Sequence, residues 1–314
     1  MTFDETPEGE GVRPFAVPIK DDFAAAAAEV LRRYRELVEK CFPDDWQPET
    51  GSRLVSDIET INANSDPVGT ARGSLHGMLL EIAGLSWDTA LDHVRALEHD
   101  IVRKPPPVWS PLVAARAVLE SCLFLEYLID PSISCALRLA RCAGLWRKDT
   151  EHTAKLARVL GPEREVEAVD LDAYVTQSLA DANVVQRHNA KGKLVGYEVD
   201  GESAGLDYNI TERVASALPS WLPTPYGLLS GAAHSRPWMT NRARNLAAGS
   251  DDRLVGEAAT VMTALMVVMA SLEMSLVAWQ GYFGFDLTEP LAKLADDRNH
   301  AYMYLLGLAH ATGD

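Results

Sequence analysis

Three polar side chains that could do chemistry recur every four residues in the C-terminal half of the chain. They are Tyr226, Ser230 and His234, and this spacing places all three on one face of a helix. His234 could act as a general base with Ser230 or Tyr226 as its partner. Nucleophilic attack by Ser230 is not expected. A nucleophilic serine usually lies at a sharp turn between a strand and a helix, whereas Ser230 is predicted to lie in the middle of a helix. The alternative is a buried hydrogen-bonded cluster that fixes the register of the helix.

A second polar set interrupts the apolar stretch from residue 108 to residue 146. Arg116 and Glu120 lie one helical turn apart, which predicts an internal pair on one face. Arg138 and Arg141 lie three residues apart and also share a face. We expect Arg138, Arg141 and Arg236 to bind an anion, because a planar guanidinium holds carboxylate or phosphate oxygens in a bidentate way.

The charge distribution favours a local anion site in an acidic protein. The chain has 314 residues with a net charge of -16, yet no Asp or Glu lies at 131–148 or at 213–250. If the two windows pack together, they would form a pocket for a small anion. The alternative is that their arginines pair with acids of other helices, such as Glu120 and Glu126. The net charge itself argues against sequence-independent DNA binding and against a membrane-surface role.

The elements that must position these residues are helices. Ser110-Pro111 is a start signal for a helix that runs to about Ile129, and Asp130-Pro131 predicts the start of a second one. Other predicted helices begin near residues 21, 53, 67, 87, 163, 211 and 225, with Gly84 separating the third from the fourth. An apolar stretch from about 253 to 282 predicts a buried central helix, and the last helix follows residue 286.

The predicted architecture is all-α, a bundle of about ten helices around a buried helical hairpin. Residues 1–18 are predicted to be a disordered tail, and residues 19–314 a single helical domain with Pro105-Pro106-Pro107 as an internal joint. The segment 190–208 is the one clear β region, predicted to form a short β-hairpin that acts as a mobile flap. The cysteines form no CxxC pair and lie among apolar residues, which is typical of the cytoplasm. No apolar leader segment is found at the start of the sequence.

Motifs for metals and nucleases are sparse. The sequence has no Glu-x-x-His pair of the kind used by helical di-iron proteins, and Asp296-Asp297 is an isolated acidic pair. We therefore predict no metal and no cofactor. Arg147 and His152 match the Arg-x4-His spacing of a class of helical ribonucleases. The alternative is that both residues simply belong to the charged, solvent-exposed face of a helix.

Together, these motifs resemble those of bacterial all-helical proteins of uncharacterised function, the DUF5677-like proteins, which are similar in turn to HEPN helical domains. The resemblance covers about the central half of the chain and lies in Arg116 to Glu120, Tyr127 to Pro131, Arg138, Arg141, Tyr226, Ser230 and His234. It implies an all-α fold and no particular activity. HEPN nucleases carry an Arg-x4-6-His pair on a central helix, and this chain offers only Arg147 and His152 for that role.

The sequence predicts a cytoplasmic helical protein with an internal Arg/His/Glu pocket for a small anionic ligand. His234, Tyr226 and Ser230 are the catalytic candidates, and Arg116, Glu120, Arg138, Arg141 and Arg236 are the ligand-binding candidates. Two alternatives are a HEPN-like ribonuclease, acting as a homodimer, and a non-catalytic interaction protein in which every one of these polar groups is internally paired. Whether the protein is an enzyme stays open at this point.

Overall fold

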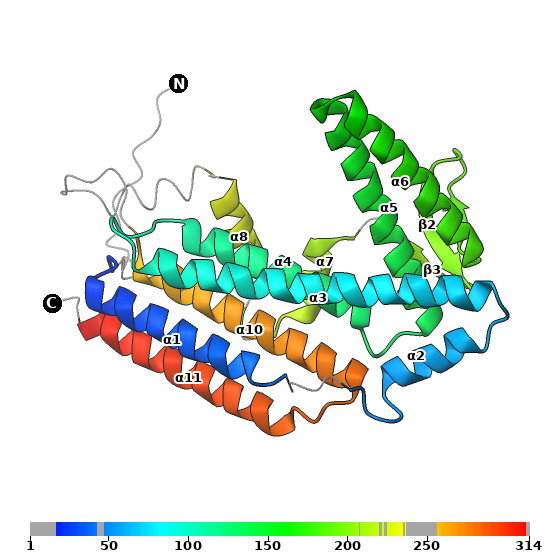
Figure 1. The fold of residues 1–314 in the computed structure, drawn as a ribbon. Coiled ribbons are helices and arrows are strands. Elements are labelled where there is room, and N and C mark those ends of the chain that lie inside the picture. The colour runs from blue at the N-terminus through cyan, green and yellow to red at the C-terminus, as the bar shows by residue number, and fades with distance from the viewer. Residues whose placement is uncertain are drawn as a thin grey trace.

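The protein is an all-α bundle with one small antiparallel sheet, as the sequence predicts (Figure 1). The computed structural model describes residues 17–42, 47–206, 208–219, 222, 225–234, 236 and 256–311. Its helices are α1 (Asp21–Glu39), α2 (Arg53–Asn62), α3 (Val68–Ile101), α4 (Ser110–Ile129), α5 (Cys135–Leu160), α6 (Pro162–Asp181), α7 (Ile210–Ala217), α8 (Pro225–Ala233), α10 (Ala258–Phe283) and α11 (Thr288–Ala311). The strands are β1 (Val185–His188), β2 (Leu194–Val199) and β3 (Glu202–Gly205).

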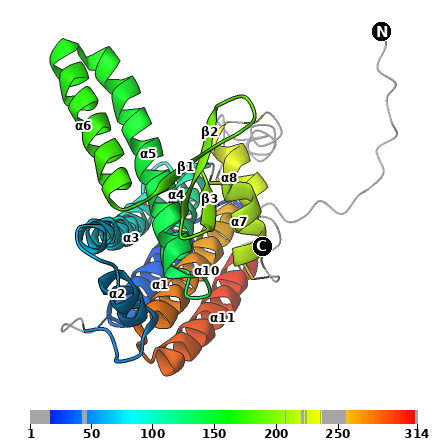
Figure 2. The same ribbon diagram turned by 90° about the vertical axis from the view of Figure 1, so that its right-hand side faces the viewer.

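The core is built by α3, α4 and α10, which pack along one another, and α1 and α11 cover the far side of α10 (Figures 1 and 2). Helix α10 is apolar around most of its circumference, which is typical of a helix buried on all sides. By length and composition it could also cross a bilayer, and 78% of its most apolar window is buried inside the fold. The prediction of a buried central helix is therefore confirmed.

Helix α3 differs from the prediction of two helices separated by Gly84. It is one helix of 34 residues. The hydroxyl of Ser86, which directly precedes the predicted start at residue 87, donates to the carbonyl oxygen of Ile82 at 2.8 Å within the same helix. Trp87, Ala90 and Leu91 are buried against neighbouring helices. Tertiary packing therefore outweighs the local cost of a mid-helix glycine, which is about 1 kcal/mol.

The first helix of the central hairpin begins where it is predicted to begin, and the second helix begins later than predicted. Helix α4 begins at Ser110 with proline in its first turn and ends at Ile129, as predicted. Helix α5 does not begin at Pro131, because Asp130 accepts hydrogen bonds from Ser132 in a turn. The N-cap is Ser134, whose hydroxyl accepts from the backbone N–H of Leu137 at 3.1 Å.

Helix α5 continues without a break through the charged segment after Trp146 and ends at Leu160. Its first half is core, and its second half leaves the body of the protein together with α6. Figures 1 and 2 show this pair as an arm that projects from the bundle. Gly161 has φ +117° and makes the reversal between the two helices, where only glycine adopts this backbone without strain.

The β segment is partly core rather than the predicted free flap. The three strands form an antiparallel sheet in the order β1-β2-β3, and β2 and β3 pack on α5. Tyr197 and Val199 are buried on the inner face of β2. Gly196 permits the close approach of the strands, because a Cβ there would lie 2.2 Å from the carbonyl oxygen of Ala204.

The N-terminal segment and the proline segment at 105–107 both pack against the residues at the start of α10. Residues 1–16 of the predicted tail lie outside the described residues, but Val17 and Pro18 are paired with the chain at Glu257, so the predicted boundary at residue 18 is wrong. The backbone N–H of Ala258 donates to Val17 O at 2.9 Å. Pro107 lies against this pairing, and its carbonyl oxygen would be 2.1 Å from a Cβ at Gly256.

Candidate functional site

Two helices bring three of the predicted site residues together. On α4, Arg116 Nε donates to Glu120 Oε1 at 2.7 Å, which is the predicted internal pair. From α8, the Tyr226 hydroxyl donates to the same oxygen at 3.1 Å and accepts from Arg116 Nη2 at 3.2 Å. The guanidinium carbon also lies 5.3 Å from the Tyr226 ring centroid. We call Arg116, Glu120 and Tyr226 the α4–α8 triad.

The triad is only partly closed to solvent. The side chains of Arg116 and Glu120 are 21% and 27% exposed. Within the described part of the chain, Arg116 Nη1 donates to no protein group, and Glu120 Oε2 accepts from none. As far as the described residues go, the site therefore offers one unused cationic donor edge beside one unused carboxylate oxygen. Burial and then the nearby Glu120 charge raise the pKa of Tyr226, so its hydroxyl stays protonated as a donor at neutral pH.

The other predicted site residues in the C-terminal half of the chain lie on α8 or just after its last residue. Ser230 is half-buried on α8, and His234 follows the last helical residue with its side chain exposed. The backbone N–H of His234 still donates to Ser230 O at 3.0 Å, so the helical line that begins at Tyr226 reaches it. Arg236 is exposed. Arg242 and Arg244 lie outside the described residues.

Arg138 does not reach this site, which corrects the prediction that it binds a ligand. Its side chain is fully buried, and its Nε and Nη2 atoms donate to Asp57 on α2, at 2.7 and 2.8 Å. Nη1 donates to the carbonyl oxygen of Asp130. Every edge of the guanidinium is therefore occupied inside the fold, and no solvent-reachable pocket is left for Arg138 to share with His234.

The buried Asp57–Arg138 pair extends into a network with α3 and α10. The Tyr282 hydroxyl donates to Asp57 Oδ2 at 3.0 Å, and its ring lies 5.0 Å from the Arg138 guanidinium carbon. Because the hydroxyl hydrogen goes to the carboxylate, His76 Nε2, 2.8 Å away, must donate to the Tyr282 oxygen. His76 therefore carries a hydrogen on Nε2. Sequence reasoning identified Arg138 but not Asp57, His76 or Tyr282.

Titration of His76 should make stability depend on pH. Burial lowers the pKa of His76 below its usual 6.5, and Arg138 adds to this although Asp57 opposes it. The unfolded chain therefore takes up a proton first as the pH falls, so stability rises with pH just below 6.5, by at most about 1.4 kcal/mol per pH unit. Urea unfolding of wild type and of His76→Gln between pH 5 and 7 measures this slope. Equal slopes in both proteins would contradict the assignment.

Arg141 lies in a further polar cluster at the end of α4. Its Nη1 donates to Tyr127 O at 2.7 Å and lies 3.5 Å from Asp130 Oδ2, with the guanidinium over the Tyr127 ring. Arg213 of α7 covers the same ring and pairs with Glu126. Arg141 is thus engaged by internal groups, and among the arginines of the acid-free windows Arg213 pairs with Glu126, as the alternative predicts.

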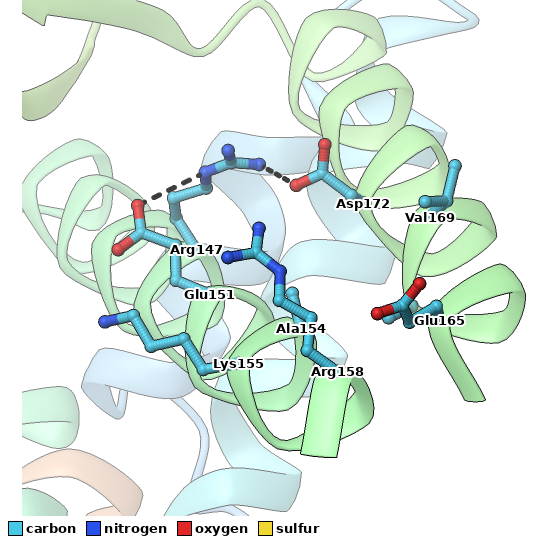
Figure 3. A pocket seen from close by; sticks show the side chains of 9 residues that line it. Arg147, Glu151, Ala154, Lys155, Arg158, Glu165, Val169 and Asp172 are labelled. Atoms are coloured by element: carbon cyan, nitrogen blue, oxygen red, sulfur yellow. Dashed lines mark hydrogen bonds and ion pairs between the residues drawn. The ribbon is translucent and has the colours of Figure 1, made fainter. Parts of the chain in front are cut away.

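Arg147 lies on the arm and is turned toward α6. Figure 3 shows its guanidinium reaching from α5 to Asp172 and, at 3.7 Å, to Glu151. A groove of 470 Å³ between the two helices includes these three residues. His152 is exposed and does not line that groove. The geometry therefore couples Arg147 to α6 rather than to His152.

Comparison with known proteins adds no relative. No protein-family model matches the chain, and no match is found among curated proteins or among solved structures. Among the described residues, no group of three or more His, Cys, Asp or Glu side chains could hold a metal ion. Fold and site thus define an all-α helical protein with a half-open Arg–Glu–Tyr triad.

Proposed function

We propose that this protein binds a small anionic ligand at the α4–α8 triad. The observation that carries the proposal is that no described residue engages Nη1 of Arg116 or the neighbouring Oε2 of Glu120. A phosphate or carboxylate oxygen would accept from Arg116, and a hydroxyl or amino group of the same ligand would donate to Glu120. His234 and Arg236 lie about 12 Å or more along the helix direction from Tyr226, so only a ligand larger than phosphate would reach them.

The triad suits binding because its geometry is fixed before a ligand arrives. Glu120 and Tyr226 hold the Arg116 fork from two sides, so little side-chain entropy is lost when an anion docks. The local sequence helps as well, because the stretch 213–250 has no acidic residue in a chain of net charge -16. Arg138 and Arg141 have no part in this proposal, since internal groups occupy them.

The test is a thermal-shift and calorimetry series with inorganic phosphate, a sugar phosphate and citrate as probes. Wild type should be stabilised by about 2.7 kcal/mol at a ligand concentration near 100 times Kd. Arg116→Gln should abolish this upshift, because it removes the cationic donor. Tyr226→Phe should weaken binding about tenfold, because one positioning hydrogen bond is lost while the ring remains.

Arg213→Gln is the matched control. Arg213 has nearly the same exposure as Arg116, at 23%, and is likewise paired with a glutamate of α4. It should keep the full response to the anion. Loss of the response in both variants, or no response in wild type to any of the three probes, would contradict the proposed site.

A further inference from the structure

A cavity that contains none of the triad residues is lined by aromatic rings. It has a volume of 280 Å³ and lies between the end of α1, the middle of α3 and the end of α10. Its aromatic lining comes from four residues, Phe42, Trp87, Trp279 and Phe283. The remaining lining residues are Leu80, Gly84 and Asp88 of α3. A cavity of this size has room for a trimethylammonium group together with the rest of a small ligand.

Phe42 meets the two tryptophan rings at steep angles, whereas Trp279 and Phe283 are tilted by only 38°. Phe42 is at 87° to Trp279, with 5.9 Å between the ring centroids. It is at 59° to Trp87, at 5.1 Å. Trp279 and Phe283 follow at 4.8 Å. Rings set in this way can present more than one negative face to a single small group, which is how proteins recognise quaternary ammonium ions.

The charge around the cavity has the sign that a cation requires. Asp88 is the one charged residue among its described lining residues, and it is exposed. The whole chain carries a net charge of -16, so its average field attracts cations as well. No arginine or lysine is among the described lining residues, in contrast to the triad on α4 and α8.

Gly84 gives the cavity its open side. A Cβ at this position would meet no atom within 4 Å, so the missing side chain leaves empty space. Glycine in the interior of a long helix is unfavourable, and α3 keeps it in the very turn that faces the aromatic residues. A bound group could fill this open space.

We propose that this aromatic cavity binds a small soluble trimethylammonium compound, with the rings facing the methyl groups and Asp88 balancing the charge. The site is separate from the proposed anion site and does not depend on it. Choline is the probe. Its neutral counterpart is dimethylbutanol, in which a carbon atom replaces the charged nitrogen without a change of shape.

Titration calorimetry of the full chain with both probes tests whether the cavity recognises the positive charge of choline. Choline should bind about tenfold more tightly than dimethylbutanol, because only the cation interacts with the ring faces. Asp88→Asn should weaken choline binding several-fold, and Asp92→Asn, an exposed change one turn along α3, should not. Gly84→Leu should abolish binding of both probes by filling the cavity.

Several results would overturn the proposal. Equal binding of the two probes would mean an apolar cavity without cation recognition. Full choline binding by Gly84→Leu would place the ligand elsewhere. Sedimentation with phosphatidylcholine vesicles, without any heat from free choline, would exclude a small soluble ligand. Tryptophan fluorescence of Gly84→Leu, compared with that of wild type in urea, confirms that the variant is folded.

Discussion

Replacing Asp57 by alanine should cost about 3–5 kcal/mol of folding free energy, the largest effect we expect from any single change. The substitution leaves the Arg138 guanidinium buried with no carboxylate, and removing one member of a buried pair carries the full desolvation penalty of the other. It also takes the acceptor from the Tyr282 hydroxyl. Urea unfolding at pH 7, monitored by circular dichroism, measures the loss.

Two further variants separate charge from packing. Glu29→Gln removes an exposed carboxylate that pairs with Arg32 and Arg33, and it should leave the unfolding midpoint nearly unchanged because solvent screens this pairing. The double substitution Asp57→Leu with Arg138→Met should recover much of the lost stability, because an apolar pair needs no desolvation. A double variant as unstable as Asp57→Ala would show that the pair is not what makes the single change costly.

The second large effect concerns the joint at Pro105–Pro107. A fragment of residues 108–314 should fail to fold cooperatively and should aggregate. It lacks α3, which packs along α4, so buried residues such as Leu112, Leu119 and Leu123 would face water. It also lacks Asp57, which leaves Arg138 without its carboxylate. Size-exclusion chromatography and a thermal melt of the fragment test this expectation.

A chain trimmed to residues 17–311 is the control for the fragment. It retains the pairing of Val17 with Ala258 and the whole described core, so it should melt cooperatively, close to the full-length temperature. If residues 108–314 alone were monomeric and melted as sharply as this control, the proline segment would separate two independent domains.

Features set by neighbouring residues could be predicted from the sequence. The bounds of α2 and α4 follow from local start signals and apolar periodicity, and the Arg116–Glu120 pair follows from a four-residue spacing. Tyr226 could be placed on a polar helix face, although its contact with α4 could not. These features depend on interactions within one or two helical turns.

Features set by distant residues could not be predicted. An arginine in an apolar helix requires a partner, but nothing local indicates that the partner of Arg138 lies on α2, 81 positions away. The continuity of α3 through Gly84 has the same cause, because contacts with other helices decide it. The aromatic cavity likewise joins residues of α3, α10 and the turn after α1, and no single stretch of sequence contains its pattern.

The unbroken length of α3 constrains how this protein can change in evolution. The helix carries His76 of the buried network, then Gly84 and Asp88 of the cavity, all at fixed steps of about 1.5 Å and 100° per residue. Inserting or deleting one residue between His76 and Gly84 would rotate one group away from its partners whatever the new residue was. Homologues should therefore differ in length at the ends of α3 and in the 189–193 turn, but not within this helix.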